Sequence, residues 1–169
     1  MLEQTLIIFK PDAIQRGLVG EILARFEKAG LKIVGMKLLA PTDAHLEGHY
    51  EGIGGLKTRK GDKIFATTVE MMKVGPVLAG VLEGVEAVDN VRRLVGPTEP
   101  KSAAPGTIRG DFAHMGYAHA DAMSVGLPNL LHASADAREA AQEIAHWFAP
   151  EELYAYGVAH EPFTQPKAK

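Results

Sequence analysis

The sequence predicts an α+β domain, and three of its features support that class. Short apolar runs, rich in β-branched residues, alternate with longer stretches whose apolar residues recur at helical spacing. Gly and Pro mark the ends of these stretches, and no internal repeat or long linker divides the chain of 169 residues. The simplest packing of strands and helices in this order is a four-stranded antiparallel, ferredoxin-like sheet with helices packed on one face.

The N-terminal part of the chain is expected to form two strands and two helices. The first strand is a continuous apolar run, and the second alternates. The first helix carries its apolar residues on one face and ends at Gly30, with Lys28 in its last turn. In order, the elements are a strand over Thr5–Phe9, a helix from about Leu18 to its stop at Gly30, a strand over Leu31–Leu39 and a helix from Pro41 to about Tyr50.

The rest of the chain is expected to add two strands and further helices. Gly52–Lys63 is a loop by composition, and Phe65–Val74 fits a helix better than a strand. Asp136 and Glu139 form a D-x-x-E start signal for the last helix. The other expected elements are a strand over Pro76–Leu82, a helix over Val85–Val95, an aperiodic segment over Ala113–Pro128, a short strand from Leu130 into His132, and a frayed tail over Gln165–Lys169.

Charge and composition exclude several classes of function. The net charge of −3 argues against broad electrostatic binding to nucleic acid, so any polyanion site must be a local cluster of basic residues. The chain has no cysteine, which rules out disulfides, thiolate catalysis and cysteine-ligated zinc. The apolar run near the N-terminus is too short for a signal peptide or a membrane span, so a cytoplasmic location without membrane association is expected.

Nucleotide binding would have to rely on side chains in this chain. Neither a G-x-x-x-x-G-K-[ST] loop nor a G-x-G-x-x-G turn after a strand occurs. The planar guanidinium of arginine donates hydrogen bonds to phosphate in pairs, although a single loop arginine is more often a solvated surface charge. The candidates, which stand at the ends of elements or in loops, are Lys10, Arg92, Arg93, Thr98 and Arg109.

The chain's histidines offer further chemistry. His45 and His49 have the i, i+4 spacing of helical metal ligands, but the sequence places no third ligand beside them. His132 differs because a short strand would project it from a strand end, and Glu143 on the next helix could orient its ring. A histidine nucleophile needs such a partner on its second nitrogen. The residues alone leave both a packed histidine and a nucleophile open.

Five segments of the chain stand in a characteristic order. They are TLIIFKPDAIQRGLVGEILARFEKAGLKIVGMKLL, GPTEP, PGTIRGDF, NLLHAS and EIAHWFAPEEL, and they extend from about Thr5 to Leu153. Together they resemble the nucleoside diphosphate kinase family. The resemblance implies a ferredoxin-like fold and one kinase domain over residues 1–169, with an insertion near 113–128 and a short C-terminal tail from about 161. It also implies a homo-oligomer, either a hexamer or a tetramer.

The activity implied by this resemblance is a ping-pong phosphoryl transfer. ATP or another nucleoside triphosphate would donate its γ-phosphoryl to His132, and a nucleoside diphosphate would then accept it. Mg²⁺ would be held through the nucleotide phosphates and not directly by protein ligands. By motif, Glu143 would hold the second ring nitrogen of His132, Ser134 would support Glu143, and Tyr50 would sit beside the histidine. Lys10 would reach the phosphates and the sugar 3′-hydroxyl. The other nucleotide-binding residues would be Arg92, Thr98 and Arg109, which bind phosphates, and Asn129, which binds the sugar hydroxyls.

The match departs from the family pattern in several places. Ala133 stands where the family has glycine, which matters if that backbone needs a positive φ, and Ala135 stands where it has aspartate. The segment before Asn129 is longer than usual and falls where part of the base-binding wall would lie. The family's base-stacking aromatic aligns near Ile64 and Phe65, which leaves open whether Phe65 stacks on the base or packs in the fold.

Two other functions compete with the kinase. A non-catalytic nucleotide-binding or scaffold protein with this fold would have lost catalytic residues, and none of the matched set is missing. An RNA-binding ferredoxin-like module would carry the strand signature K/R-G-F/Y-G/A-F-V-x-F/Y, which the sequence lacks.

Overall fold

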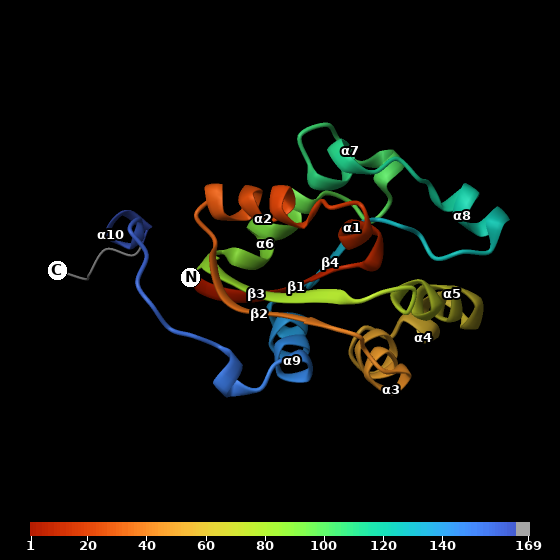
Figure 1. The fold of residues 1–169 in the computed structure, drawn as a ribbon, viewed down its shortest axis with the longest axis horizontal. Coiled ribbons are helices and arrows are strands. Elements are labelled where there is room, and N and C mark those ends of the chain that lie inside the picture. Colours follow the sequence, from red (N-terminus) through yellow and green to blue (C-terminus); the bar gives the residue numbers. More distant parts are fainter. Residues whose placement is uncertain (165–169) are drawn as a thin grey trace.

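A four-stranded antiparallel sheet organises the chain, and the computed structural model describes residues 1–164 (Figure 1). The strand order is β2-β3-β1-β4, so β3 and β1 are the central strands. This arrangement confirms the α+β, ferredoxin-like class predicted from the sequence. The strands are β1 (Leu2–Phe9), β2 (Lys32–Leu39), β3 (Val77–Val85) and β4 (Leu131–Ala133).

Helices cover both faces of the sheet, which corrects the one-sided packing expected from the sequence (Figure 1). Successive side chains of a strand point to opposite faces, and in β1 both sets are fully buried: Ile7 and Phe9 on the first face, Leu6 and Ile8 on the second. The first face carries α1 (Pro11–Gln15), α2 (Val19–Lys28), α6 (Ala87–Val95) and α7 (Ile108–Phe112), and the second carries α3 (Asp43–Glu47), α5 (Asp62–Met72) and α9 (Ala137–Trp147).

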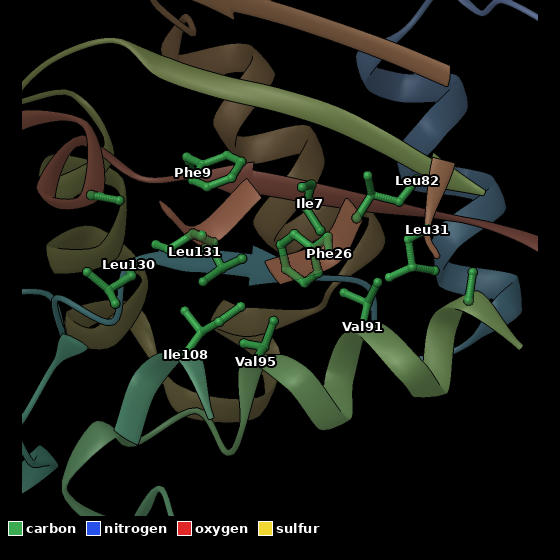
Figure 2. Packing of buried hydrophobic residues seen from close by; sticks show 13 residues of the cluster. Ile7, Phe9, Phe26, Leu31, Leu82, Val91, Val95, Ile108, Leu130 and Leu131 are labelled. Carbon is green, nitrogen blue, oxygen red and sulfur yellow. The ribbon is translucent and has the colours of Figure 1, made fainter. Parts of the chain in front are cut away.

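The core on the first face holds β4 in place. Figure 2 shows Phe26 of α2 between Ile7 of β1 and Val91 of α6, with Leu130 and Leu131 at the other end of the same cluster. All five side chains are fully buried. Since burying one such side chain stabilises the fold by about 1.5–3 kcal/mol, this cluster fixes the short strand that carries His132.

One short helix lies in a region that was expected to be a loop. α4 (Leu56–Lys60) occupies part of Gly52–Lys63, and it is bounded by Gly55 at φ 56° and Gly61 at φ 88°. The glycines that suggest a loop in the sequence therefore stand at the two ends of a helix, where the backbone needs positive φ.

Two other segments also differ from the expected pattern. The helix expected to reach Tyr50 ends at Glu47 and continues as a π-helix, η1 (Gly48–Ile53). The aperiodic segment contains α8 (Tyr117–Met123), which lies opposite α4 and α5 across the right side of Figure 1.

The C-terminal segment returns along the edge strand β2. The backbone N–H of Tyr154 donates to the carbonyl of Val34 at 2.8 Å. The expected tail over Gln165–Lys169 lies outside the described residues, and none of the helices described is both long and apolar enough to span a bilayer. The remaining short elements are the 3₁₀ turns η2 (Pro100–Ser102) and η3 (Pro150–Glu152) and the helix α10 (Glu161–Thr164).

Candidate active site

A cavity of about 560 Å³ opens where the end of β1 lies beside the start of β4. Antiparallel pairing brings Lys10, which follows β1, next to the beginning of β4. The cavity is lined by most of the residues that the sequence singled out, which come from separate segments of the chain. These lining residues are Lys10, Tyr50, Arg92, Thr98, Arg109, Asn129, His132 and Glu143.

His132 presents one ring nitrogen to the cavity and the other to a carboxylate. It lies opposite Ile8 in the β1–β4 pair, so its side chain is on the second face of the sheet, toward α9. Its Nε2 lies 2.7 Å from Oε1 of Glu143, which is hydrogen-bond distance, although the angle departs from that of an ideal bond. Nδ1 has no hydrogen-bond partner within residues 1–164, and the side chain remains 19% exposed.

Glu143 is held by a second contact behind the histidine. The Ser134 hydroxyl donates to Glu143 Oε2 at 2.6 Å, and both side chains are almost completely buried. α9 presents Glu143 to the site because it begins at Asp136, whose carboxylate accepts the Glu139 N–H at 2.8 Å as an N-cap. Burial raises the pKa of Glu143.

The surroundings of His132 keep its imidazole neutral. Burial and, to a smaller extent, the positive charge of Lys10 together lower the pKa of His132 to about 3. A neutral ring has a lone pair on one nitrogen, so the chemically reactive form of His132 predominates at cell pH.

His49 completes the cavity wall behind His132, and sequence reasoning did not place it there. The Trp147 indole N–H donates to His49 Nδ1 at 3.2 Å, and the His49 ring meets the His132 ring edge-on at 4.6 Å between centroids. Burial holds the pKa of His49 well below its usual value, so its 3.5 Å contact with Glu143 is not an ion pair. Its i, i+4 spacing with His45 suggested a metal ligand, whereas its position on a π-helix is typical of functional sites.

Lys10 and Asn129 form a polar bridge across the cavity floor. The Lys10 ammonium donates to Asn129 Oδ1 at 2.7 Å, and the Asn129 amide donates to the carbonyl of Thr98 at 2.8 Å. Burial, followed by the charge of Arg109, lowers the pKa of Lys10 to about 8. The lysine therefore remains mostly charged at neutral pH.

The two cavity arginines are held very differently. Arg109 is buried and donates to three backbone carbonyls, those of Asn129 at 3.0 Å, Gly96 at 3.0 Å and Leu131 at 2.5 Å. Arg92 is exposed, and its contact with the carbonyl of Ser134 is long, at 3.5 Å. Arg109 thus organises the loops of the site, and Arg92 has its guanidinium available for a ligand.

Tyr50 brings a hydroxyl that lacks a partner. Its Oη is buried and makes no hydrogen bond within residues 1–164, and burial raises its pKa, so it stays protonated. A buried donor without an acceptor is costly unless a ligand or water supplies one. Tyr50 lines the cavity beside His49, so an acceptor atom bound in the cavity would satisfy its hydroxyl.

Ile64 lines the cavity, and Phe65 does not. Ile64 belongs to the cavity wall, whereas Phe65 packs against the core cluster on the second face of the sheet. The Phe65 ring also lies 6.0 Å from the Lys57 ammonium. The sequence left open whether Phe65 stacks or packs, and in this structure it packs.

The backbone beside His132 is strained at Leu130 and not at Ala133. Ala133 sits in β4 without a positive φ, so the replaced glycine needs no special conformation there. Leu130 has φ 72°, and its backbone is held by the Lys10 N–H at 2.8 Å and by the Asp12 carboxylate at 3.0 Å. This turn lets Asn129 and His132 face the same cavity.

Comparisons with known proteins show which family this chain is similar to. A family model for nucleoside diphosphate kinase matches residues 3–153. Nucleoside diphosphate kinase of Pyrococcus furiosus is 45% identical over 168 residues, which cover 98% of this chain and 95% of that protein.

Two solved structures are also similar to this chain. The Borrelia burgdorferi nucleoside-diphosphate kinase, a transition-state mimic with bound vanadate and ADP, has a TM-score of 0.94, with 36% identity and 98% of both chains covered. The Halobacterium salinarum enzyme in complex with CDP has a TM-score of 0.82, with 34% identity and coverage of 97% of this chain and 99% of that one.

Proposed function

The chain belongs to the nucleoside diphosphate kinase family and transfers a phosphoryl group from a nucleoside triphosphate to a nucleoside diphosphate, and we propose that His132 carries this group between two half-reactions. The observation that supports this role is the contact of His132 Nε2 with Glu143, which directs Nδ1 to a cavity lined by Lys10, Arg92 and Arg109.

In the first half-reaction, the lone pair on His132 Nδ1 attacks the γ-phosphorus of the triphosphate. The bond from phosphorus to the bridging oxygen breaks, and its electron pair leaves on the diphosphate. The ring becomes positive as the new P–N bond forms, and the Glu143 carboxylate, 2.7 Å from Nε2, stabilises that charge. In the second half-reaction, a terminal oxygen of another diphosphate attacks the same phosphorus, and the P–N bond returns its electrons to Nδ1.

The cations and hydroxyls of the cavity position and neutralise the transferring group. Phosphoryl transfer requires mainly alignment and charge stabilisation from the protein. Lys10 and Arg92 offer positive charge to the phosphate oxygens, and the buried hydroxyl of Tyr50 can donate to one of them. Thr98 and Asn129 also line the cavity, where Thr98 would bind the phosphates and Asn129 the sugar hydroxyls.

Mg²⁺ is part of the proposal as an ion that binds with the nucleotide. Within residues 1–164, one group of three potential ligands lies close together, namely His49, His132 and Glu143, with their ligand atoms within 4.8 Å of one another. Two imidazoles suit Mg²⁺ poorly because this ion prefers oxygen ligands and retains water. The residues therefore fit a Mg²⁺ held by phosphate oxygens, where it would neutralise part of the phosphate charge.

The wider proposal covers substrates, assembly and location. ATP and other nucleoside tri- and diphosphates are the substrates, supported by ADP and CDP in the two similar structures. A homo-oligomer, either a hexamer or a tetramer, follows from the family resemblance, and light scattering after gel filtration tests it. A cytoplasmic location, expected from the sequence, can be tested by cell fractionation.

Labelling of the protein tests the function directly. The enzyme is incubated with γ-labelled ATP and Mg²⁺ without an acceptor, and the label should be acid-labile and should leave upon addition of GDP. His132→Ala should take up no label, with His160→Ala as a control because His160 lies outside the cavity. Label that persists in His132→Ala would place the phosphorylated residue elsewhere.

A further inference from the structure

The insertion segment, residues 113–128, is fixed at its N-terminal end. The Tyr117 N–H donates to Glu99 Oε1 at 2.8 Å, and the Lys101 N–H donates to the carbonyl of Met115 at 3.2 Å. Gly116 lies so close to these residues that a Cβ there would stand 2.9 Å from Lys101 Cδ and 3.0 Å from Glu99 Oε1. The segment is therefore packed against the preceding loop.

The other end of the insertion segment is fixed to α5. Gly126 is buried, and a Cβ there would lie 2.6 Å from the carbonyl oxygen of Thr67 and 2.8 Å from Met71 Cβ. Between its two anchored ends, the segment carries α8, which lies opposite α5 (Figure 1). The insertion segment therefore forms one ordered wall of the cavity. The residues that it contributes to the lining are Tyr117, Ala120, Asp121, Val125, Gly126 and Leu127.

Tyr117 gives this wall a hydroxyl that could donate a hydrogen bond to a phosphate. Its side chain is 47% exposed, it lines the same cavity as Arg109 and Thr98, and its hydroxyl makes no hydrogen bond within residues 1–164. Tyr117 is held beside Glu99 by its backbone N–H, and Arg109 donates to the carbonyl of Gly96 at 3.0 Å, three residues before Glu99. Tyr117 and Arg109 are therefore both attached to the short segment 96–99, which also carries the cavity residue Thr98.

We propose that Tyr117 is a nucleotide-binding residue whose hydroxyl donates a hydrogen bond to a phosphate oxygen of the bound nucleotide, beside Arg109. The proposal rests on the proposed function, because it assumes that the cavity holds the phosphates there. A phosphate oxyanion is a strong acceptor, and hydrogen bonds to charged groups are stronger than neutral ones. Because phosphates are common to all nucleotides, this contact adds affinity without selecting a base.

Removing only the hydroxyl tests the proposal. Tyr117→Phe keeps the ring and the backbone N–H that binds Glu99, so the wall stays anchored. The dissociation constants of ADP, GDP and CDP should each rise roughly tenfold, by a similar factor for all three. In steady-state kinetics, KM should rise more than kcat falls. Tyr154→Phe, a change at an exposed tyrosine outside the cavity, is the matched control and should bind like the wild type.

Wild-type affinity in Tyr117→Phe would overturn the proposal, whichever way Tyr117→Ala behaves. If Tyr117→Ala also bound all three nucleotides normally, Tyr117 would make no contact with the nucleotide. If Tyr117→Ala instead lost affinity for some bases only, the ring would stack on the base. In both cases the Tyr117 variants should still take up label from γ-labelled ATP on His132. Loss of this labelling in the wild type would instead show that the proposed function is wrong.

Discussion

His132 and Glu143 meet through Nε2 and Oε1 at 2.7 Å, so the nitrogen left for chemistry is Nδ1. The phosphoryl group should therefore be attached to Nδ1 in the phosphorylated enzyme. ³¹P NMR of the phosphoenzyme, compared with the two phosphohistidine isomers as standards, distinguishes the two nitrogens. A phosphoryl group on Nε2 would contradict the geometry.

The variant Glu143→Gln provides the control for this assignment. It keeps the size of the side chain but removes the charge that stabilises the imidazolium, so phosphorylation should slow by roughly 10- to 150-fold, as expected for a hydrogen bond to a charged group. The phosphoryl group should still be on Nδ1. An unchanged rate would mean that the carboxylate only packs against the ring.

Stability should fall in mild acid because of His132. Its pKa is about 3 in the folded protein and near 6.5 when unfolded, so between these values the unfolded chain binds more protons. Each pH unit below about 6.5 then costs up to about 1.4 kcal/mol of unfolding free energy for this group. Urea midpoints at about pH 7.5 and about pH 5 measure the loss.

His132→Gln is the comparison for this pH dependence. The raised pKa of Glu143 has the opposite effect, since it makes the folded protein bind protons as the pH falls. Glu143 is present in both the wild type and His132→Gln. The difference between their losses of unfolding free energy in acid therefore reports mainly on His132. Equal losses of stability in wild type and variant would refute the low pKa.

Nucleotide affinity should decrease as the pH rises through about 8. Lys10 has a pKa of about 8 in the free protein, so above that value it loses the charge that attracts phosphate. A bound phosphate favours the charged form, and ADP binding near pH 8 should therefore take up a proton. Calorimetry in two buffers with different ionisation enthalpies measures this uptake. Lys10→Gln should bind ADP weakly and without the proton uptake.

Replacing either cavity arginine by lysine should weaken ATP binding, but only the change at Arg109 should also lower the stability of the fold. Arg109→Lys removes donors from three backbone carbonyls and should lower the free energy of unfolding by about 2–4 kcal/mol. Arg92→Lys, at an exposed position, should change it by less than about 0.5 kcal/mol. Both variants should bind ATP less tightly. Equal urea midpoints for the two variants would contradict the structural role of Arg109.

The placement of Lys10, His132 and Glu143 could be predicted because local signals in the sequence determine it. The N-cap at Asp136 starts α9, and Glu143, two turns into that helix, then faces the strand that carries His132. The apolar run of β1 likewise placed Lys10 at a strand end. These signals depend on neighbours in the sequence, so they predict where the side chains stand. The roles expected of these side chains came from the resemblance to the kinase family.

The features that sequence reasoning missed depend on helix register and on contacts between distant segments. In α5, residues 64, 67, 68 and 71 line the cavity, while Val69 and Met72 face the core with Phe65. The start of α5 was not evident from composition, so the side on which Phe65 lies was not predictable. The role of His49 likewise follows from a hydrogen bond to Trp147, which is 98 residues away.

The left-handed backbone at Leu130 carries a consequence for how the protein folds. A leucine disfavours φ 72°, at a cost of order 1–3 kcal/mol, so the isolated segment 129–133 does not adopt this turn by itself. The bonds that impose it come from Lys10 and Asp12, at the opposite end of the sequence. The catalytic centre should therefore assemble late, after most of the helices have formed. In refolding experiments, ADP binding should recover more slowly than far-ultraviolet circular dichroism, and Leu130→Gly should narrow that delay; simultaneous recovery in the wild type would argue against this order.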